Sequence, residues 1–96
     1  MGATLTIPFY RKDFGAWAAR TKATVYQAAS DGILCAWTTA GGGVTLMTAA
    51  ANPPVTEIGY DSGPAFNGQS IAVKKGDYYE VDATAADVIN WIPLEP

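Results

Sequence analysis

The sequence is divided into short stretches in which apolar and polar residues alternate, and most of these stretches end at glycine, proline, asparagine or aspartate. Alternation with a period of two places every second side chain on one face of a β-strand, whereas a helix needs a period of about 3.6 residues. The alternating stretches are residues 4–9, 23–28, 32–39, 44–49, 55–60, 69–75, 76–83 and 87–94. The pattern therefore predicts an all-β protein of about eight short antiparallel strands.

The spacing of the turn signals indicates how these strands are arranged. Turns at intervals of about 8 to 12 residues favour a compact β-sandwich or jelly roll. Two windows compete with this pattern: residues 11–22, where Gly15 lowers the helix propensity, and residues 83–87, which are long enough only for a connector. Because no repeat, linker or low-complexity segment divides the 96 residues, we predict a single jelly-roll domain over residues 1–96.

The charge of the chain argues against a nucleic-acid ligand. The net charge is −3, and a protein that neutralises phosphates needs a clustered excess of lysine and arginine. Residues 11–22 carry four basic residues against Asp13, which gives this basic segment a local charge of +3. It would either contact acidic neighbours within or between subunits or remain a solvated loop. No stretch reaches the ~18 apolar residues of a membrane span, and no secretory signal is recognisable, which predicts synthesis in the cytoplasm without membrane insertion.

The residue types that most enzymes use are scarce. The chain has no histidine and one cysteine, Cys35, which removes the commonest general base, the commonest metal ligand and any internal disulfide. Cys35 lies in an apolar stretch and is expected to be a small buried hydrophobe. Asp61 and Asn67 could offer oxygen ligands to calcium, but their spacing is not that of a calcium loop and both are common turn formers. We therefore expect no enzymatic activity, no metal site and no cofactor.

Two glycine-containing turns are predicted to close hairpins. The three glycines at residues 41–43 lead into the strand at 44–49, and Gly76 with Asp77 follows the strand at 69–75. The side chains expected to face the core on either side of the second turn are Ile71, Val73, Tyr79, Val81 and Ala83.

The stretch at residues 87–94 has apolar side chains on both faces. One face carries Ile89, Trp91 and Pro93, and the other carries Val88, Ile92 and Leu94. Since a strand of a small antiparallel sandwich normally turns one face to solvent, this stretch indicates cover by another subunit. Pro93 cannot donate to a ladder, which suits an edge or terminal position. The predicted subunit interface consists of Val88, Ile89, Trp91, Ile92 and Leu94.

Three motifs carry a resemblance to known families. The run IAVKKGDYYEV at residues 71–81 resembles the penultimate hairpin of C1q and tumour-necrosis-factor-like jelly rolls. Together with ASDGILCAW and the later WIPL, it is similar to the small C-terminal knob domains of bacteriophage tail and head fibres. The resemblance covers residues 30–96, while residues 1–29, with the first strand and the basic segment, match poorly. It implies a non-enzymatic, homotrimeric virion module whose partners are other phage virion proteins and whose loops are displayed at a tip.

Aromatic and polar side chains gather at several predicted turns. Those expected to contact a ligand or receptor are Tyr60, Asp61, Phe66, Asn67 and Tyr78. Aromatic rings beside small polar groups are typical of sugar recognition, although the same rings could close the end of the sandwich. Trp37 and Trp91 lie in apolar strands and are expected in the core or an interface.

Two functions are consistent with the sequence. The first is a trimeric fibre or tail knob of a phage virion that contributes to particle assembly or to attachment at the host surface, with a host-surface glycan as a candidate partner. The second is a stand-alone bacterial carbohydrate-binding β-sandwich. Oligomeric state separates the two, because only the first requires a trimer.

Overall fold

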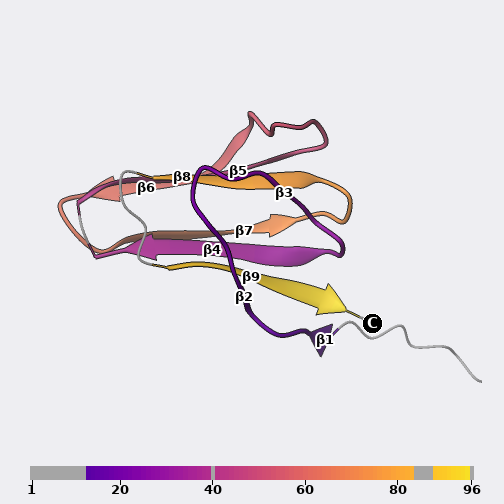
Figure 1. Ribbon diagram of the computed structural model, residues 1–96. Helices are drawn as coiled ribbons and strands as arrows, with labels where there is room; N and C mark the ends of the chain where they lie inside the picture. The colour runs from indigo at the N-terminus through magenta and orange to yellow at the C-terminus, as the bar shows by residue number, and fades with distance from the viewer. Residues whose placement is uncertain (1–12, 40, 84–87, 96) are drawn as a thin grey trace, which may run out of the picture.

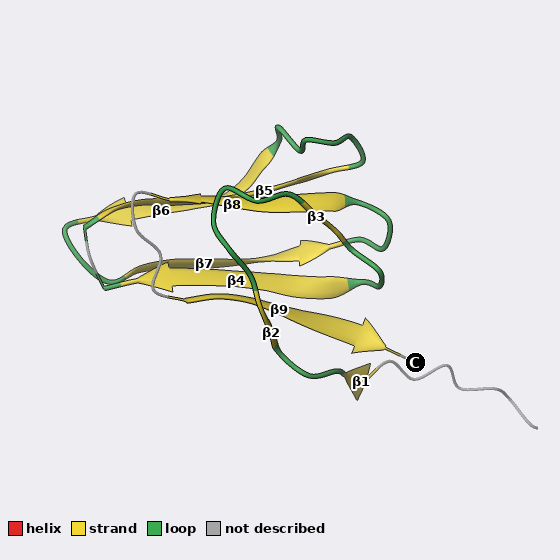
Figure 2. Cartoon of the chain, viewed as in Figure 1, coloured by secondary structure: helices red, strands yellow, loops and turns green. Residues whose placement is uncertain are grey.

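The computed structural model describes residues 13–39, 41–83 and 88–95, and these form nine β-strands (Figure 1). The strands are β1 (Asp13–Phe14), β2 (Ala18–Ala19), β3 (Tyr26–Gln27), β4 (Gly32–Thr38), β5 (Gly42–Ala49), β6 (Glu57–Gly63), β7 (Asn67–Val73), β8 (Tyr78–Ala83) and β9 (Val88–Glu95). The described residues contain no helix, as Figure 2 shows, and the predicted all-β class is confirmed. The strand expected at residues 4–9 and most of the connector expected at 83–87 lie outside the described residues.

The strands form two antiparallel sheets that face each other as layers (Figure 1). The first sheet has the order β1-β9-β4-β7, with β2 also paired to β9, and the second has the order β3-β8-β5-β6. The pairing is nested: β5 pairs with β6, β4 with β7, β3 with β8, and β2 with β9. Strands that follow one another in sequence therefore mostly lie in opposite layers.

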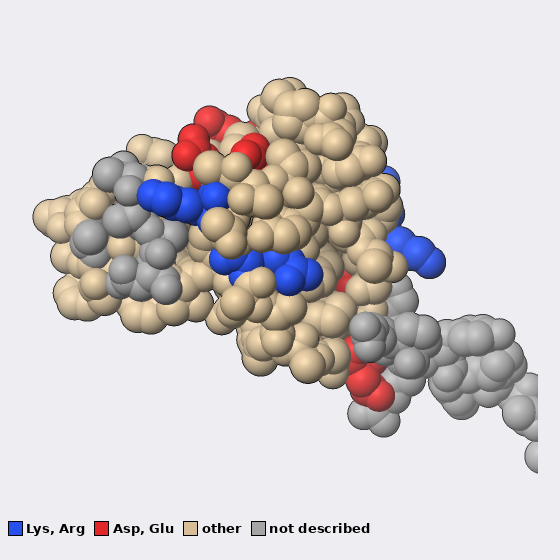
Figure 3. Space-filling view, viewed as in Figure 1, with Lys and Arg blue, Asp and Glu red and all other residues tan. Residues whose placement is uncertain are grey.

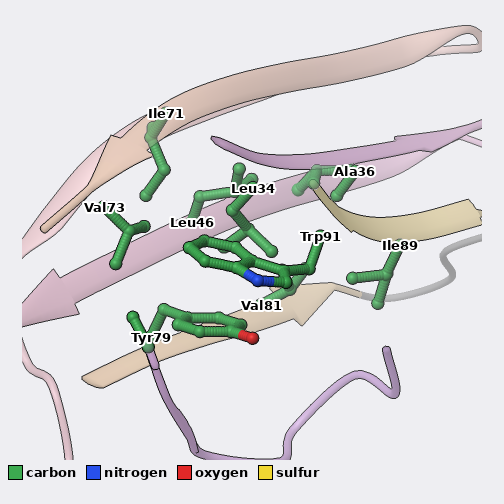
Figure 4. Close-up of a cluster of buried hydrophobic side chains, with 11 residues drawn as sticks. Leu34, Ala36, Leu46, Ile71, Val73, Tyr79, Val81, Ile89 and Trp91 are labelled. Atoms are coloured by element: carbon green, nitrogen blue, oxygen red, sulfur yellow. The ribbon is translucent and has the colours of Figure 1, made fainter. Parts of the chain in front are cut away.

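The core lies between the two layers and is built by the alternation seen in the sequence (Figure 4). Its buried members are Ala28, Leu34, Ala36, Val44, Leu46, Ile71, Val73, Tyr79, Val81, Ile89 and Trp91. Removing aliphatic side chains of this size from water stabilises the fold by about 1.5–3 kcal/mol each. The inward direction predicted for the strands on either side of Gly76 is confirmed, since Ile71 and Tyr79 are both buried.

An aromatic stack fills one part of this core. The rings of Tyr79 and Trp91 are stacked with centroids 4.6 Å apart, and Tyr26 stacks on Tyr79 with a centroid distance of 5.5 Å. Gly32 makes room for Trp91, because a Cβ built on this glycine would lie 2.4 Å from a carbon of the indole. Trp91 is 4% exposed, so it belongs to the core of the single chain.

Both predicted hairpins are wrong, because each turn passes from one sheet to the other. At the second turn Asp77 N–H donates to the Lys74 carbonyl oxygen at 3.0 Å, and Gly76 has a φ of +88°, so the tight turn itself is present. It joins β7 of the first sheet to β8 of the second. The chain likewise passes from β4 in the first sheet to β5 in the second, and Gly42 and Gly43 are the first residues of β5. A hairpin and a crossing between facing sheets give the same alternation, since both turn their apolar faces toward one core.

Of the edge or terminal position predicted from Pro93, only the edge is wrong: β9 is the last described strand of the chain, but it lies between β4 and the short strands β1 and β2. The Pro93 carbonyl accepts a hydrogen bond from Gly15 N–H at 2.7 Å. The nitrogen and carbonyl of one strand residue point to the same side, so the missing donor of Pro93 faces the interruption between β1 and β2. A proline is tolerated here because no continuous ladder runs past it.

Candidate functional site

The outer face of the first sheet is uncharged over its three long strands. In β4 the alternation that turns Leu34 inward turns Ile33, Cys35 and Trp37 outward. Ladder partners extend this face across β7 and β9, and we call it the apolar sheet face: Ile33, Cys35, Trp37, Gly68, Ser70, Ala72, Val88, Asn90, Ile92 and Leu94. None of these side chains carries a charge, and the polar ones, apart from the thiol, are a serine and an asparagine. Such a face is apolar enough to gain from being covered.

Trp37 is the largest exposed side chain on the apolar sheet face. It is 43% exposed and lies over Gly68, whose hypothetical Cβ would be 3.0 Å from the Trp37 Cβ. At the other end of the strands a shallow hollow of about 450 Å³ is lined by apolar residues of the strands and, at its rim beyond β4 and β7, by two charged residues: Gly32, Ile33, Ala72, Val73 and Leu94, with Asp31 and Lys74. A protruding ring and a hollow on the same surface can give shape complementarity between two associating subunits.

The residues predicted as a subunit interface are divided by the sandwich. Ile89 and Trp91 point inward and belong to the core, whereas Val88, Ile92 and Leu94 lie on the apolar sheet face. Ile92 is only 7% exposed in the single chain and lies outside the core cluster. Its burial therefore needs no second subunit, whereas Trp37 on the same face stays exposed.

One expectation for the strand at 32–39 needs correction, and another is narrowed. Cys35 is half-buried on the outer face rather than in the core, and this burial raises the pKa of its thiol above the ordinary value. Trp37 was expected in the core or in an interface; its exposed side chain excludes the core, and the interface stays a prediction. The alternation with Leu34 and Ala36 was the signal that could have placed both side chains on the outer face.

The outer face of the second sheet has the opposite character, and we call it the polar sheet face. Its outward residues include Thr45, Met47, Tyr60, Ser62, Glu80 and Asp82. In Figure 3 a group of acidic side chains lies at the upper left, over the layer that contains β6 and β8. Basic side chains lie below this group, across the centre of the view. The two sides of the sandwich are therefore chemically different.

The five predicted loop residues do not form one surface. Tyr60 and Phe66 are exposed, at 59% and 78%, but Tyr78 begins β8 at the opposite end of the sandwich from Phe66. Asp61 accepts a hydrogen bond from Gly68 N–H at 2.8 Å. Asn67 is buried and donates to the carbonyls of residues 42 and 63 at 2.8 and 3.1 Å. Asp61 and Asn67 thus hold the crossing between β6 and β7 and are not oriented toward a ligand.

The basic segment is tied to its own chain where the structure describes it. Arg20 Nε donates to the Tyr79 hydroxyl at 2.9 Å, and its guanidinium lies 4.9 Å from the centre of the Tyr26 ring. The hydrogen bond from Thr21 N–H to the Tyr26 hydroxyl lowers the pKa of Tyr26. Arg11 and Lys12 lie outside the described residues. Arg20 therefore extends the aromatic stack of the core toward the surface.

Neither a metal-binding cluster nor a membrane-spanning helix is present among the described residues. No three histidine, cysteine, aspartate or glutamate side chains among them are grouped as a metal ion would require. None of the described segments is a helix long and apolar enough to cross a membrane.

No protein-family model, no curated protein and no solved structure matches this chain.

Proposed function

We propose that this chain is a non-enzymatic structural module of a bacteriophage virion, a homotrimeric jelly-roll knob of a tail or head fibre. It would be made in the host cytoplasm and assembled with other virion proteins, where it contributes to particle assembly or host-surface attachment. The nested pairing of β2 with β9, β3 with β8, β4 with β7 and β5 with β6 supports the jelly roll. It is the order obtained when one long hairpin of strand pairs is rolled into two sheets.

The observation that carries the proposal is the uncharged apolar sheet face. Subunit interfaces are depleted of charge at their centres and enriched in large aromatic anchors, and Trp37 is such a residue on a face without charge. Copies of the same chain are the simplest cover, because identical subunits in a closed ring bury the same patches in each copy. The number three comes from the resemblance of residues 30–96 to fibre knobs.

The mass of the protein in solution tests this proposal. Light scattering at micromolar concentration should give three times the 10.1 kDa of one chain. Trp37→Glu should lower the mass toward one chain, because a carboxylate would be buried without a partner. Ile58→Glu is the matched control, since Ile58 is similarly exposed, at 55%, but lies on β6 of the other sheet.

Each outcome of this measurement bears on a different part of the proposal. A wild-type mass near 10.1 kDa would refute the trimer. If the trimer survives Trp37→Glu but not Ile58→Glu, the interface lies on the second sheet, and the proposed role of the apolar sheet face is refuted. Circular dichroism of both variants confirms that any loss of mass is dissociation of folded chains. Ile92→Asp is unsuitable, because Ile92 is buried within the single chain and its replacement would unfold the subunit.

The alternative is a stand-alone bacterial carbohydrate-binding β-sandwich. The exposure of Tyr60, 59%, on the polar sheet face favours it. A monomeric wild-type protein that binds sugar would support this alternative over the virion knob.

A further inference from the structure

A shallow groove crosses three strands of the polar sheet face. Thr45 of β5 is paired with Tyr60 of β6 on one side and with Asp82 of β8 on the other. Together with Gly43 and Ala83 these residues line a hollow of about 480 Å³. The antiparallel register therefore brings an aromatic ring, a hydroxyl and a carboxylate into one row, although they are far apart in sequence.

The Tyr60 ring packs against Gly43, which has no side chain to displace it. A Cβ on Gly43 would lie 3.2 Å from the ring carbon Cε2 and 3.4 Å from the phenol oxygen. Any larger residue would press against the ring, so the glycine lets Tyr60 lie close to the backbone of β5. With 59% of the side chain exposed, the ring offers an apolar platform to solvent.

The polar groups beside the ring suit hydroxyl ligands. The Asp82 carboxylate accepts hydrogen bonds and the Thr45 hydroxyl both donates and accepts. Within the described part of the chain, the side chains of Thr45, Tyr60 and Asp82 have no hydrogen-bond partner. Asp82 is the one charged residue in the lining, so the groove disfavours anions. A single carboxylate also falls short of the several oxygen ligands that a calcium ion requires.

We propose that this groove binds a neutral hexopyranose unit of a glycan. The apolar C–H face of the sugar ring stacks on Tyr60, neighbouring hydroxyls of the sugar donate to the Asp82 carboxylate, and the Thr45 hydroxyl takes a further hydrogen bond. This site replaces the loop set predicted from the sequence, of which only Tyr60 is retained. Its residues lie on strands, which hold their geometry better than loops.

The position of the groove fits a subunit that associates through its other sheet. The polar and apolar sheet faces are the opposite outer surfaces of the sandwich, so cover of one leaves the other accessible. Three identical grooves would then face outward, and simultaneous binding to a glycan surface would strengthen weak single sites. This threefold presentation rests on the proposed trimer, whereas binding at one groove does not.

Amide chemical shifts measured by nuclear magnetic resonance test the single site. The probes are methyl β-galactopyranoside, methyl β-glucopyranoside and N-acetylglucosamine at millimolar concentrations, with glucuronate as the anionic comparison. At least one neutral sugar should shift the amides of Gly43, Thr45, Tyr60 and Asp82, and glucuronate should bind more weakly. If none of the neutral sugars shifts these amides, or if glucuronate binds best, the proposal is overturned.

Variants separate the ring from the fold. Tyr60→Ala should remove measurable binding, and Asp82→Asn should weaken it about fivefold to tenfold because a charged acceptor becomes neutral. Tyr60→Trp keeps a ring and should retain binding. The matched control is Ile58→Ala, on the same strand and with nearly the same exposure, 55%; equal loss in this control would contradict a role for the ring.

A second arm distinguishes this inference from the proposed function. The dissociated Trp37→Glu chain should keep the single-site shifts but lose tight binding to a sugar-coated surface. A monomeric wild-type protein whose groove binds sugar would overturn the virion trimer and support the groove. A trimer whose groove amides ignore every neutral sugar would overturn the groove and leave the trimer standing.

Discussion

Gly32→Ala is predicted to destabilise the protein severely although it adds only one methyl group. The new Cβ would lie 2.4 and 2.5 Å from two carbons of the Trp91 indole and 2.7 Å from the Ile92 carbonyl oxygen. The indole cannot retreat freely, because its face is stacked on Tyr79 at 4.6 Å. The backbone oxygen belongs to β9, which is paired with β4 from Val88 to Pro93. Relief therefore requires a shift of a strand or the loss of the aromatic stack.

The magnitude follows from the cost of overpacking a dense core. Inserting a methylene into a well-packed site costs about 1–3 kcal/mol, and contacts this short, one of them to backbone, place Gly32→Ala at about 3 kcal/mol or more. For a domain of this size each kcal/mol lowers the melting temperature by about 4–8 °C. We therefore expect a loss of about 12 °C or more.

A matched glycine variant separates packing from backbone strain. Gly76→Ala adds the same methyl where nothing lies within 4 Å, at a φ of +88°, so its cost is the left-handed conformation alone, about 1 kcal/mol. Thermal melts followed by circular dichroism compare the two variants, and Trp fluorescence should red-shift in Gly32→Ala as Trp91 is displaced. If the melting temperature of Gly32→Ala is no lower than that of Gly76→Ala, the close packing of the Trp91 indole against Gly32 is refuted.

Three further predictions concern the core, a crossing and the thiol. Trp91→Ala should cost about 3–5 kcal/mol in urea unfolding, because Trp91 is 4% exposed in the single chain; a loss below 1 kcal/mol would contradict its place in the core. Asn67→Ala should cost about 1–3 kcal/mol by leaving two carbonyls without their amide donor, whereas a polar swap at the exposed Ser62 should change the unfolding free energy little. Because burial raises the pKa of Cys35, its thiol should be protonated at pH 7 and react slowly with a disulfide reagent. The reaction rate should keep rising at pH values above the ordinary thiol pKa. A rate that levels off below the ordinary pKa would contradict the raised pKa of Cys35.

The strands could be predicted from the sequence because the alternation of apolar and polar residues within one strand shows which side chains face the core and which face solvent. The alternation in Gly32–Thr38 separates Leu34 from Ile33 without knowledge of any partner. The sequence does not report which layer a strand joins, because a turn such as Gly76 with Asp77 can close a hairpin or cross between sheets with the same apolar pattern. Sheet assignment depends on packing among distant segments, which local residues do not encode.

The candidate site could be predicted only in part for the same reason. Tyr60 was found because a large ring beside turn residues is visible in the sequence, but its neighbours Thr45 and Asp82 come from other strands and meet it only through the register. For Asp61 and Asn67 the sequence left two roles open, because side chains that brace a turn are of the same type as those that bind ligands. Their roles became clear only from the backbone groups that they contact.

The nested strand pairing also sets the order in which the chain can fold. The β5–β6 pair closes the shortest loop, whereas β4 with β7, β3 with β8 and β2 with β9 enclose progressively longer parts of the chain. Each outer pair must pay a larger loop-closure entropy, so formation from the inside outward is the route of least cost. Trp91 then joins the core late, because it lies on β9. Until β9 has docked, the aromatic stack is incomplete and the first sheet exposes one edge of β4. The native structure also has a high contact order, because most of its strand pairs join distant parts of the chain. Folding should be slow for a chain of this length, with the final step limited by the docking of β9.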